Sequence, residues 1–352
     1  MATEETVSAG ESKTVTANSI IVKVEAGDSA LKSAGRRLLV TVLVASIMMN
    51  LMFLISTMFS AVSGSGGDSV PTSHHSGDKG SKAKLAVINF SGMIMPPYTE
   101  RWLKQIQAAA EDDNIQGVLL AVDSPGGLVA DSHQIYRELQ KLRTKKPIYV
   151  AMKRLAASGG YYISMGIGPE GKIFAEPTTW TGSIGVIIPR YNATELASKI
   201  GVTVEPLVTG PLKDTLNPFR DMRDSEKLVW DAILKDSFDR FVGVIQENRA
   251  GLDDEQVRAL ATGQIYTTNQ AIENGLVDEI GYEEDALDAL AAVLQLDSYE
   301  AVQYATEQTL MDLLLGGKSA TPRNMLEEFL DTTTPKALYY SSWNPWVPTT
   351  SR

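Results

Sequence analysis

The sequence contains no cysteine and only three histidines among its 352 residues. Without cysteine, the chain cannot form disulfides, use a thiolate nucleophile or bind zinc through thiolates. It also lacks a surplus of positive charge, because its formal net charge is −11. Nucleic acid is therefore not an expected partner, since phosphate binding needs a basic surface. The HExxH pattern of zinc peptidases is absent too. We accordingly expect no metal and no other cofactor.

Charge is missing from one stretch, residues 38–62, an apolar run of 25 residues. At about 1.5 Å per residue, a helix of this length crosses the roughly 30 Å hydrocarbon layer of a membrane. The run begins after 37 residues and is longer than the apolar core of a cleavable signal peptide, which favours a signal anchor. Lys32, Arg36 and Arg37 precede it, and the next cation is Lys79. By the positive-inside rule, the N-terminus is expected in the cytoplasm and the rest of the chain outside the cell membrane.

Composition divides the chain around this run into a tail, a linker, a folded domain and an extension. We expect a cytoplasmic tail at 1–37, a flexible Gly/Ser linker at 63–83, a folded domain at 84–300 and a C-terminal extension at 301–352. His74 and His75 fall in the expected linker. Because an adjacent pair in a flexible segment is usually solvated, we assign no function to them.

Within the folded domain, short apolar runs alternate with longer amphipathic stretches. Strands are predicted at 85–90, 117–122, 147–152, 172–175, 183–188 and 203–208. Helices are predicted at 99–112, 130–143, 158–167, 224–250, 253–261, 267–274 and 283–295. Strands that alternate with helices are typical of an α/β domain with a largely parallel sheet.

Two glycine-containing motifs follow predicted strands. The first is DSPGG at 123–127, where glycine lets a backbone amide approach a bound group and stabilise an oxyanion. A tight turn with Asp123 or Ser124 capping the next helix is the alternative. The second is AASGGYY at 156–162, where Ser158 stands among small residues at a predicted helix start. An uncrowded hydroxyl suits a nucleophile, but small residues also allow a helix to pack closely on a sheet.

A serine nucleophile needs a base. His133 lies on a predicted amphipathic helix and is the weaker candidate. Lys213, in GPLKDTLNPF, is the other candidate, as in Ser-Lys variants of the catalytic triad. Such a lysine must lose its proton near neutral pH, which burial favours because burial disfavours the ammonium form. Ser183 and Thr181, in TGSIGV, are the hydroxyls available to orient it.

In this order, the motifs resemble the signal peptide peptidase A (SppA, protease IV) family of serine peptidases, specifically its single-repeat members. The similarity covers about residues 84–300. It rests on DSPGG at 123–127, ASGGYY at 157–162, TGSIGV at 181–186, GPLKD with NPF at 210–219, and ATGQIYTTNQAIENGLVDEIG at 261–281. Departures from the family pattern at Leu212, Gln264 and Thr268 do not touch the proposed chemistry.

The resemblance implies a ClpP/crotonase-like α/β fold and a Ser-Lys dyad. Ser158 matches the family's nucleophile, Lys213 its general base and Ser183 its lysine-orienting serine. The family's oxyanion donor is an amide of a DSPGG glycine, best matched by Gly127, and the Gly159 amide is a second candidate by analogy with the ClpP fold. The family forms ring-like homo-oligomers in which neighbouring subunits build the active site. Its members cut remnant signal peptides and other membrane-associated or unfolded polypeptides.

Two other functions remain open at this point. A crotonase-type acyl-CoA enzyme would share the fold and the oxyanion hole, but its substrate is cytoplasmic, and no basic pocket for the CoA phosphates is evident in the sequence. A catalytically silent membrane scaffold would keep the fold for assembly alone. The presence of both Ser158 and Lys213 favours an enzyme over a scaffold.

Overall fold

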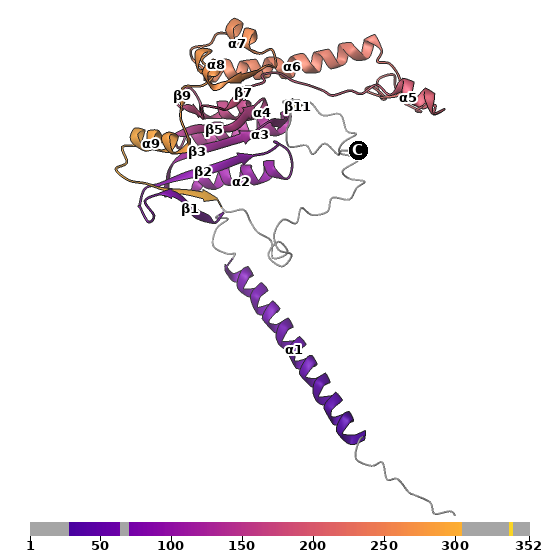
Figure 1. The fold of residues 1–352 in the computed structure, drawn as a ribbon, viewed down its shortest axis with the longest axis vertical. Helices are drawn as coiled ribbons and strands as arrows, with labels where there is room; N and C mark the ends of the chain where they lie inside the picture. The colour runs from indigo at the N-terminus through magenta and orange to yellow at the C-terminus, as the bar shows by residue number, and fades with distance from the viewer. Residues whose placement is uncertain (1–27, 64–69, 305–337, 341–352) are drawn as a thin grey trace, which may run out of the picture. The chain divides into compact units, whose positions relative to one another are not determined.

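The computed structural model describes residues 28–63, 70–304 and 338–340. The chain divides into two units, Met1–Asp68 and Ser69–Arg352. Helix α1 (Asp28–Ser63) is the described part of the first unit (Figure 1). Among the described residues no helix is long and apolar enough to cross a membrane, and the anchor at 38–62 stays a prediction. The predicted tail as far as residue 27 and the predicted extension at 305–337 and 341–352 lie outside the described residues.

The second unit is built around a nine-stranded, mainly parallel sheet (Figure 1). Its main path runs in the order β1-β10-β2-β3-β5-β6-β9, and β7 pairs with both β5 and β8. Two pairs are antiparallel, β1 with β10 and β7 with β8. The strands are β1 (Thr72–Gly77), β2 (Lys84–Ser91), β3 (Ile115–Ser124), β5 (Ile148–Ala157), β6 (Ile173–Ala175), β7 (Trp180–Gly182), β8 (Ile265–Thr267), β9 (Glu279–Ile280) and β10 (Glu300–Tyr304). This arrangement confirms the predicted α/β class.

Helices cover both faces of the sheet. Along β3, Val118, Leu120 and Val122 point into one apolar core, while Leu119 and Ala121 point into the other. The first core includes residues of α2 (Tyr98–Glu111), α3 (Val129–Arg143), α4 (Gly159–Ser164) and α6 (Asp224–Asn248), and the second includes residues of α9 (Glu283–Val293). The other described helices of this unit are α5 (Thr194–Lys199), α7 (Asp254–Leu260) and α8 (Thr268–Glu273). Because strands such as β3 are buried on both faces, their sequences are continuous apolar runs.

Two strand predictions are wrong, those at 183–188 and 203–208. Strand β7 instead ends at Gly182, and the next residue, Ser183, has a positive φ of 50° that leaves the extended conformation. Residues 185–235, called the arm below, contain α5 and the first part of α6 (Figure 1). Only two side chains of the arm are buried, those of Ala197 and Glu226. The apolar run at 203–208 therefore has no sheet neighbour in the part of the chain that the structure describes.

The expected flexible linker is also partly wrong, because residues 72–77 form strand β1. Antiparallel pairing with β10 places both linker histidines against carboxylates at the edge of the sheet. The Nδ1 atom of His74 lies 3.0 Å from Glu300, and the Nε2 atom of His75 lies 2.5 Å from Glu283. These pairs connect residues more than two hundred positions apart, a distance over which local composition carries no information.

The contact of His75 predicts a pH-dependent contribution to stability. Its hydrogen bond with Glu283 raises the pKa of His75 above the ordinary value. Since the folded state then binds the proton more tightly, the stabilisation is complete below about pH 6.5 and is lost as the pH rises through the folded pKa. His75→Gln should therefore lower the melting temperature at acidic pH and have little effect at alkaline pH.

His133 provides the matched control. Burial lowers its pKa, so its contribution to stability changes with pH in the opposite direction. The destabilisation by His133→Gln should grow as the pH rises, since only the neutral ring is favoured in the folded state. Melting temperatures of His75→Gln and His133→Gln, measured from acidic to alkaline pH, test both predictions. A His75→Gln effect that does not change with pH would contradict the assignment.

Candidate active site

Ser158 stands at the junction between strand β5 and helix α4. Its backbone has φ 55° and ψ −114°, a region that residues other than glycine rarely adopt. Hydrogen bonds hold this conformation on both sides. The Ser158 N–H donates to the Gly182 carbonyl at 2.7 Å, and the Tyr162 N–H donates to the Ser158 carbonyl at 2.8 Å. Strained backbone of this kind persists where the surroundings over-determine it, and it clusters at functional sites.

The Ser158 side chain is buried without a hydrogen-bond partner. The residue is 0% exposed, and among the described residues nothing bonds its Oγ atom. A buried hydroxyl normally finds a partner, because leaving it unpaired costs about 1–3 kcal/mol. An unpaired hydroxyl at a strained turn therefore marks Ser158 as a candidate functional group whose partner is not among the described residues.

Gly127 and Gly159 lie side by side next to this serine. A Cβ atom built on Gly159 would lie 3.1 Å from the Gly127 nitrogen, and one built on Gly127 would lie 2.1 Å from the Ile94 carbonyl oxygen. Only glycine fits at 127. The Gly159 amide opens helix α4 and so has no acceptor within the helix. Two backbone amides close to one another beside Ser158 are the kind of donors that an oxyanion hole uses.

The direction of the Gly127 amide follows from its neighbours in β4 (Gly126–Leu128). The Leu128 N–H donates to the Ile94 carbonyl at 2.8 Å, and the Gly126 carbonyl accepts from the Ile94 N–H at 2.9 Å. Successive residues of a strand direct their backbone polar groups to opposite sides. The Gly127 N–H therefore faces away from Ile94.

Another strand lies on the side of β4 that faces away from Ile94. Strand β11 (Leu338–Tyr340) pairs with it in antiparallel fashion, and Tyr339 is the register partner of Gly127. The edge that carries the candidate oxyanion amide can thus pair with an extended polypeptide. No feature of the sequence indicated that residues 338–340 belong here.

Near this edge lie Ser124, which the sequence offered as a possible helix cap, and Ser132, which sequence reasoning missed. The Ser124 Oγ accepts from the Gly126 N–H at 3.1 Å and donates to the Gly92 carbonyl at 2.6 Å, so it shapes the turn. It does not cap α3, which starts later, after Leu128. Ser132 Oγ is buried, has no partner among the described residues and would lie 2.7 Å from a Cβ atom on Gly159. Its only sequence signal is its place one turn into a predicted helix.

Of the two hydroxyls proposed to orient the lysine, only one remains available. Thr181 Oγ1 donates to the Ala156 carbonyl at 2.6 Å and is buried. Ser183 is 7% exposed, and its N–H donates to the Gln264 carbonyl at 2.7 Å. It follows Gly182, the residue whose carbonyl binds the Ser158 N–H, so Ser183 lies close to the nucleophile candidate.

Neither candidate base bonds Ser158 within the chain. The His133 Nδ1 atom lies 2.7 Å from the Tyr162 hydroxyl, which occupies it. Lys213 lies in the arm with its side chain exposed. Since Ser158 Oγ has no partner among the described residues, Lys213 of the same chain is not within hydrogen-bond reach. The fold brings Ser158 and the two candidate oxyanion glycines together, but it does not bring Lys213 of the same chain to them.

Comparison with known proteins agrees with these motifs. Residues 140–297 match the model of peptidase family S49. A putative signal peptide peptidase SppA of Enterococcus faecium is 40% identical over 254 residues, which are 68% of this chain and 73% of that protein. A putative protease of Synechocystis is 37% identical over 240 residues, 68% of this chain and 85% of that protein. A solved structure of a ClpP1 mutant from Listeria monocytogenes overlaps 57% of this chain and 94% of its own, with 19% identity and a TM-score of 0.40. On its sequence relatives, the chain belongs to the SppA family of serine peptidases, peptidase family S49.

Proposed function

We propose that this protein is a membrane-anchored serine endopeptidase with a Ser158–Lys213 dyad and a ClpP/crotonase-like fold. Its proposed substrates are remnant signal peptides and other membrane-associated or unfolded polypeptides. The observation that carries the proposal is the buried, unpartnered Ser158 Oγ beside the adjacent glycines 127 and 159. A fluorophosphonate probe, which reacts with activated serines, tests it by mapping of the labelled residue. Labelling at a residue other than Ser158 would overturn the assignment.

The chemistry follows from these positions. Ser158 Oγ attacks the carbonyl carbon of the scissile bond, and its proton passes to the neutral Lys213 amine. The carbonyl oxygen becomes an oxyanion, which accepts hydrogen bonds from the Gly127 and Gly159 amides. The resulting ammonium returns its proton to the leaving amine as the peptide bond breaks. Water, deprotonated by the same lysine, then hydrolyses the acyl-enzyme and regenerates the Ser158 hydroxyl.

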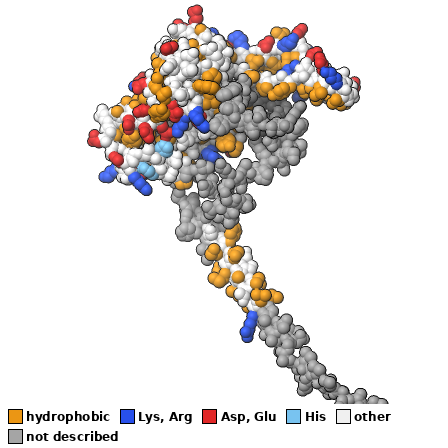
Figure 2. Space-filling model, viewed as in Figure 1, with side chains coloured by type: hydrophobic (Ala, Val, Ile, Leu, Met, Phe, Trp, Pro, Cys, Tyr) orange, Lys and Arg blue, Asp and Glu red, His pale blue; other side chains and the backbone are white. Residues whose placement is uncertain are grey.

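We place Lys213 on a neighbouring subunit in this mechanism. Among the described residues the Lys213 side chain is exposed and Ser158 Oγ is unpaired, so each group lacks what the other would supply. The arm that carries Lys213 exposes many apolar side chains, among them Tyr191, Leu196, Ile200, Leu207, Leu212, Phe219 and Leu228 (Figure 2). Large exposed apolar surfaces mark sites of protein association. A homo-oligomeric ring would cover this surface and enclose the lysine.

The membrane part of the proposal rests on the sequence. Residues 38–62 are uncharged and apolar, and the preceding basic residues favour a cytoplasmic N-terminus. A peptidase domain tethered outside the cell membrane would meet polypeptides left at that surface. The Gly127 edge of β4 suits them, because an extended chain can add to a strand through backbone hydrogen bonds alone.

Strand β11 occupies this edge and should compete with substrate. If Gly127 and Tyr339 form a hydrogen-bonded pair, as the direction of the Gly127 amide indicates, Tyr339→Pro removes one N–H from it. Loss of a backbone hydrogen bond of about 1 kcal/mol would release the strand about fivefold. Hydrolysis of a peptide substrate at concentrations below KM should rise accordingly.

Tyr339→Ala is the matched control for this substitution, because it retains the backbone N–H. It should leave the rate of hydrolysis close to that of the wild type. Equal rates for the wild type and Tyr339→Pro would show that β11 does not compete with the substrate.

A further inference from the structure

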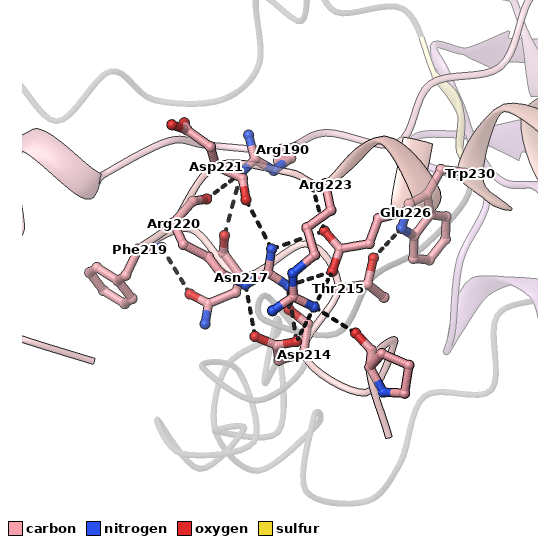
Figure 3. Close-up of polar contacts among 11 residues, drawn as sticks. Arg190, Asp214, Thr215, Asn217, Phe219, Arg220, Asp221, Arg223, Glu226 and Trp230 are labelled. Atoms are coloured by element: carbon pink, nitrogen blue, oxygen red, sulfur yellow. Dashed lines mark hydrogen bonds and ion pairs between the residues drawn. The ribbon is translucent and has the colours of Figure 1, made fainter. Parts of the chain in front are cut away.

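Asp214, the residue that follows Lys213 in the sequence, belongs to a cluster of four charged side chains in the arm (Figure 3). At its centre, the Arg220 guanidinium binds two carboxylates. Arg220 Nε donates to Asp214 Oδ2 at 2.8 Å, and NH1 donates to Glu226 Oε2 at 2.9 Å. The fourth member, Arg223, also contacts Glu226, through its backbone N–H at 2.9 Å. The two arginines and two carboxylates have no net formal charge.

This cluster holds the backbone on both sides of Lys213. On the C-terminal side, Arg220 NH2 donates to both the carbonyl oxygen and the carboxylate of Asp214, the next residue, at 3.1 and 2.9 Å. On the N-terminal side, Arg223 NH1 donates to the Pro211 carbonyl at 2.7 Å. Arginine contacts therefore flank Lys213 on both sides, at the carbonyls of Pro211 and Asp214.

Glu226 connects these arginine contacts to a rigid element. It lies in the first turn of α6, the helix whose C-terminal half packs in the core with Phe241 and Ile245. Between residues 198 and 240, Glu226 is the only buried side chain, and it is 0% exposed. Among the described residues no apolar core orders this segment, and we infer that polar contacts to Glu226 do so.

We propose that Arg220 and Glu226 are positioning residues that fix the loop around Lys213, so that its amine reaches Ser158 of a neighbouring subunit. This inference rests on the proposed function. Arginine suits the task because its planar fork binds two carboxylates and backbone carbonyls in one fixed geometry. An ion pair that buries a carboxylate contributes little net stability compared with apolar packing, and we infer that this one serves to fix the geometry of the loop.

The Glu226 carboxylate of this cluster keeps its charge in the neutral pH range. Hydrogen bonds from Arg220 lower the pKa of the Glu226 carboxyl to about 2. Glu226 therefore remains ionised in the neutral range, and protonation of this carboxylate does not release the loop there. Its role is constant positioning rather than pH sensing.

The test is the isosteric substitution Glu226→Gln in the full-length protein. It removes the charge that binds Arg220, and a displacement of Lys213 by about 1 Å should lower kcat for a fluorogenic peptide about 100-fold. KM should change little, because the loop positions a base and does not bind the substrate. Asp278→Asn is the matched control. It breaks a second arginine–carboxylate pair, with Arg249 at 2.8 Å, remote in sequence from Lys213, and should leave kcat unchanged.

Arg220→Lys provides a second variant that preserves the charge. A lysine cannot bind both carboxylates and the Asp214 carbonyl in this geometry, so kcat should fall as in Glu226→Gln. Melting curves establish that each variant is folded, and if Glu226→Gln fails to fold, Arg220→Lys decides. Folded Glu226→Gln and Arg220→Lys variants with the kcat of the wild type would overturn the proposal.

A double substitution separates positioning of Lys213 from a general effect on the fold. In a Lys213→Ala background, Glu226→Gln should not slow fluorophosphonate labelling of Ser158 any further, because there is no amine left to misplace. If Glu226→Gln slows labelling by the same factor with Lys213 absent as with Lys213 present, the positioning role is overturned. If Lys213→Ala alone retains full activity, the proposed function fails. If only Lys213→Ala is inactive, the positioning inference alone fails.

Discussion

Replacement of Ser158 by alanine should lower peptide hydrolysis about a million-fold, the loss typical of removing a serine nucleophile. The only atom removed is Oγ, which in the described structure forms no hydrogen bond. Its removal costs no hydrogen bond among the described residues and relieves a buried unpaired hydroxyl, so the variant should be at least as stable as the wild type. Hydrolysis of a fluorogenic peptide and thermal unfolding measure the two effects.

Ser164→Ala is the matched control for this substitution. Ser164 lies on the same helix and is equally buried, but its Oγ donates to the Gly160 carbonyl at 2.8 Å. Its replacement should cost about 1 kcal/mol of stability and leave the rate nearly unchanged. If the protein is a catalytically silent scaffold, Ser158→Ala will not lower the rate of hydrolysis, since no hydrolysis depends on that hydroxyl.

Removal of Lys213 should abolish hydrolysis, and mixing should restore it. Lys213→Ala lacks the base and Ser158→Ala lacks the nucleophile, so each homo-oligomer is inactive. If the lysine acts across a heterologous interface, about one quarter of the sites in a randomly mixed 1:1 oligomer combine an intact serine with an intact lysine. Activity of the re-associated mixture, relative to the wild type at equal concentration, measures this fraction.

Each other outcome of the mixing experiment has a distinct meaning. An inactive mixture, with subunit exchange demonstrated, would place the lysine and the serine of one site on the same chain. Full activity in Lys213→Ala would transfer the base role elsewhere. Lys227→Ala is the control, because Lys227 forms a surface pair with Asp224 in the same arm and such pairs contribute little. It should be as active as the wild type.

Local chemistry explains which parts of the site were predictable. DSPGG and AASGGYY each end a strand that is buried on both faces, so apolar runs followed by small residues mark them in the sequence. Parallel neighbours β3 and β5 end at the same edge of the sheet. That topology brings Gly127 and Gly159 together, although the motifs are separated by some thirty residues.

The wrong predictions share a physical cause. The runs at 183–188 and 203–208 are apolar, which predicts that they are buried. An apolar pattern does not show whether a sheet, a helix or another subunit buries them. The structure places 203–208 in an arm that is exposed within one chain. His74 and His75 were assigned to a solvated linker because their partners, Glu300 and Glu283, lie far along the sequence.

Short motifs and local periodicity were enough to predict the α/β class, the family, and the nucleophile and base candidates. The folded structure was needed to show that Ser158 Oγ is buried without a partner among the described residues and that β11 pairs with the Gly127 edge. It was also needed to show that contacts of Arg220 and Arg223 flank Lys213. These features join residues distant in the sequence through hydrogen bonds and burial. Such contacts exist only after the chain has folded, and no local pattern encodes them.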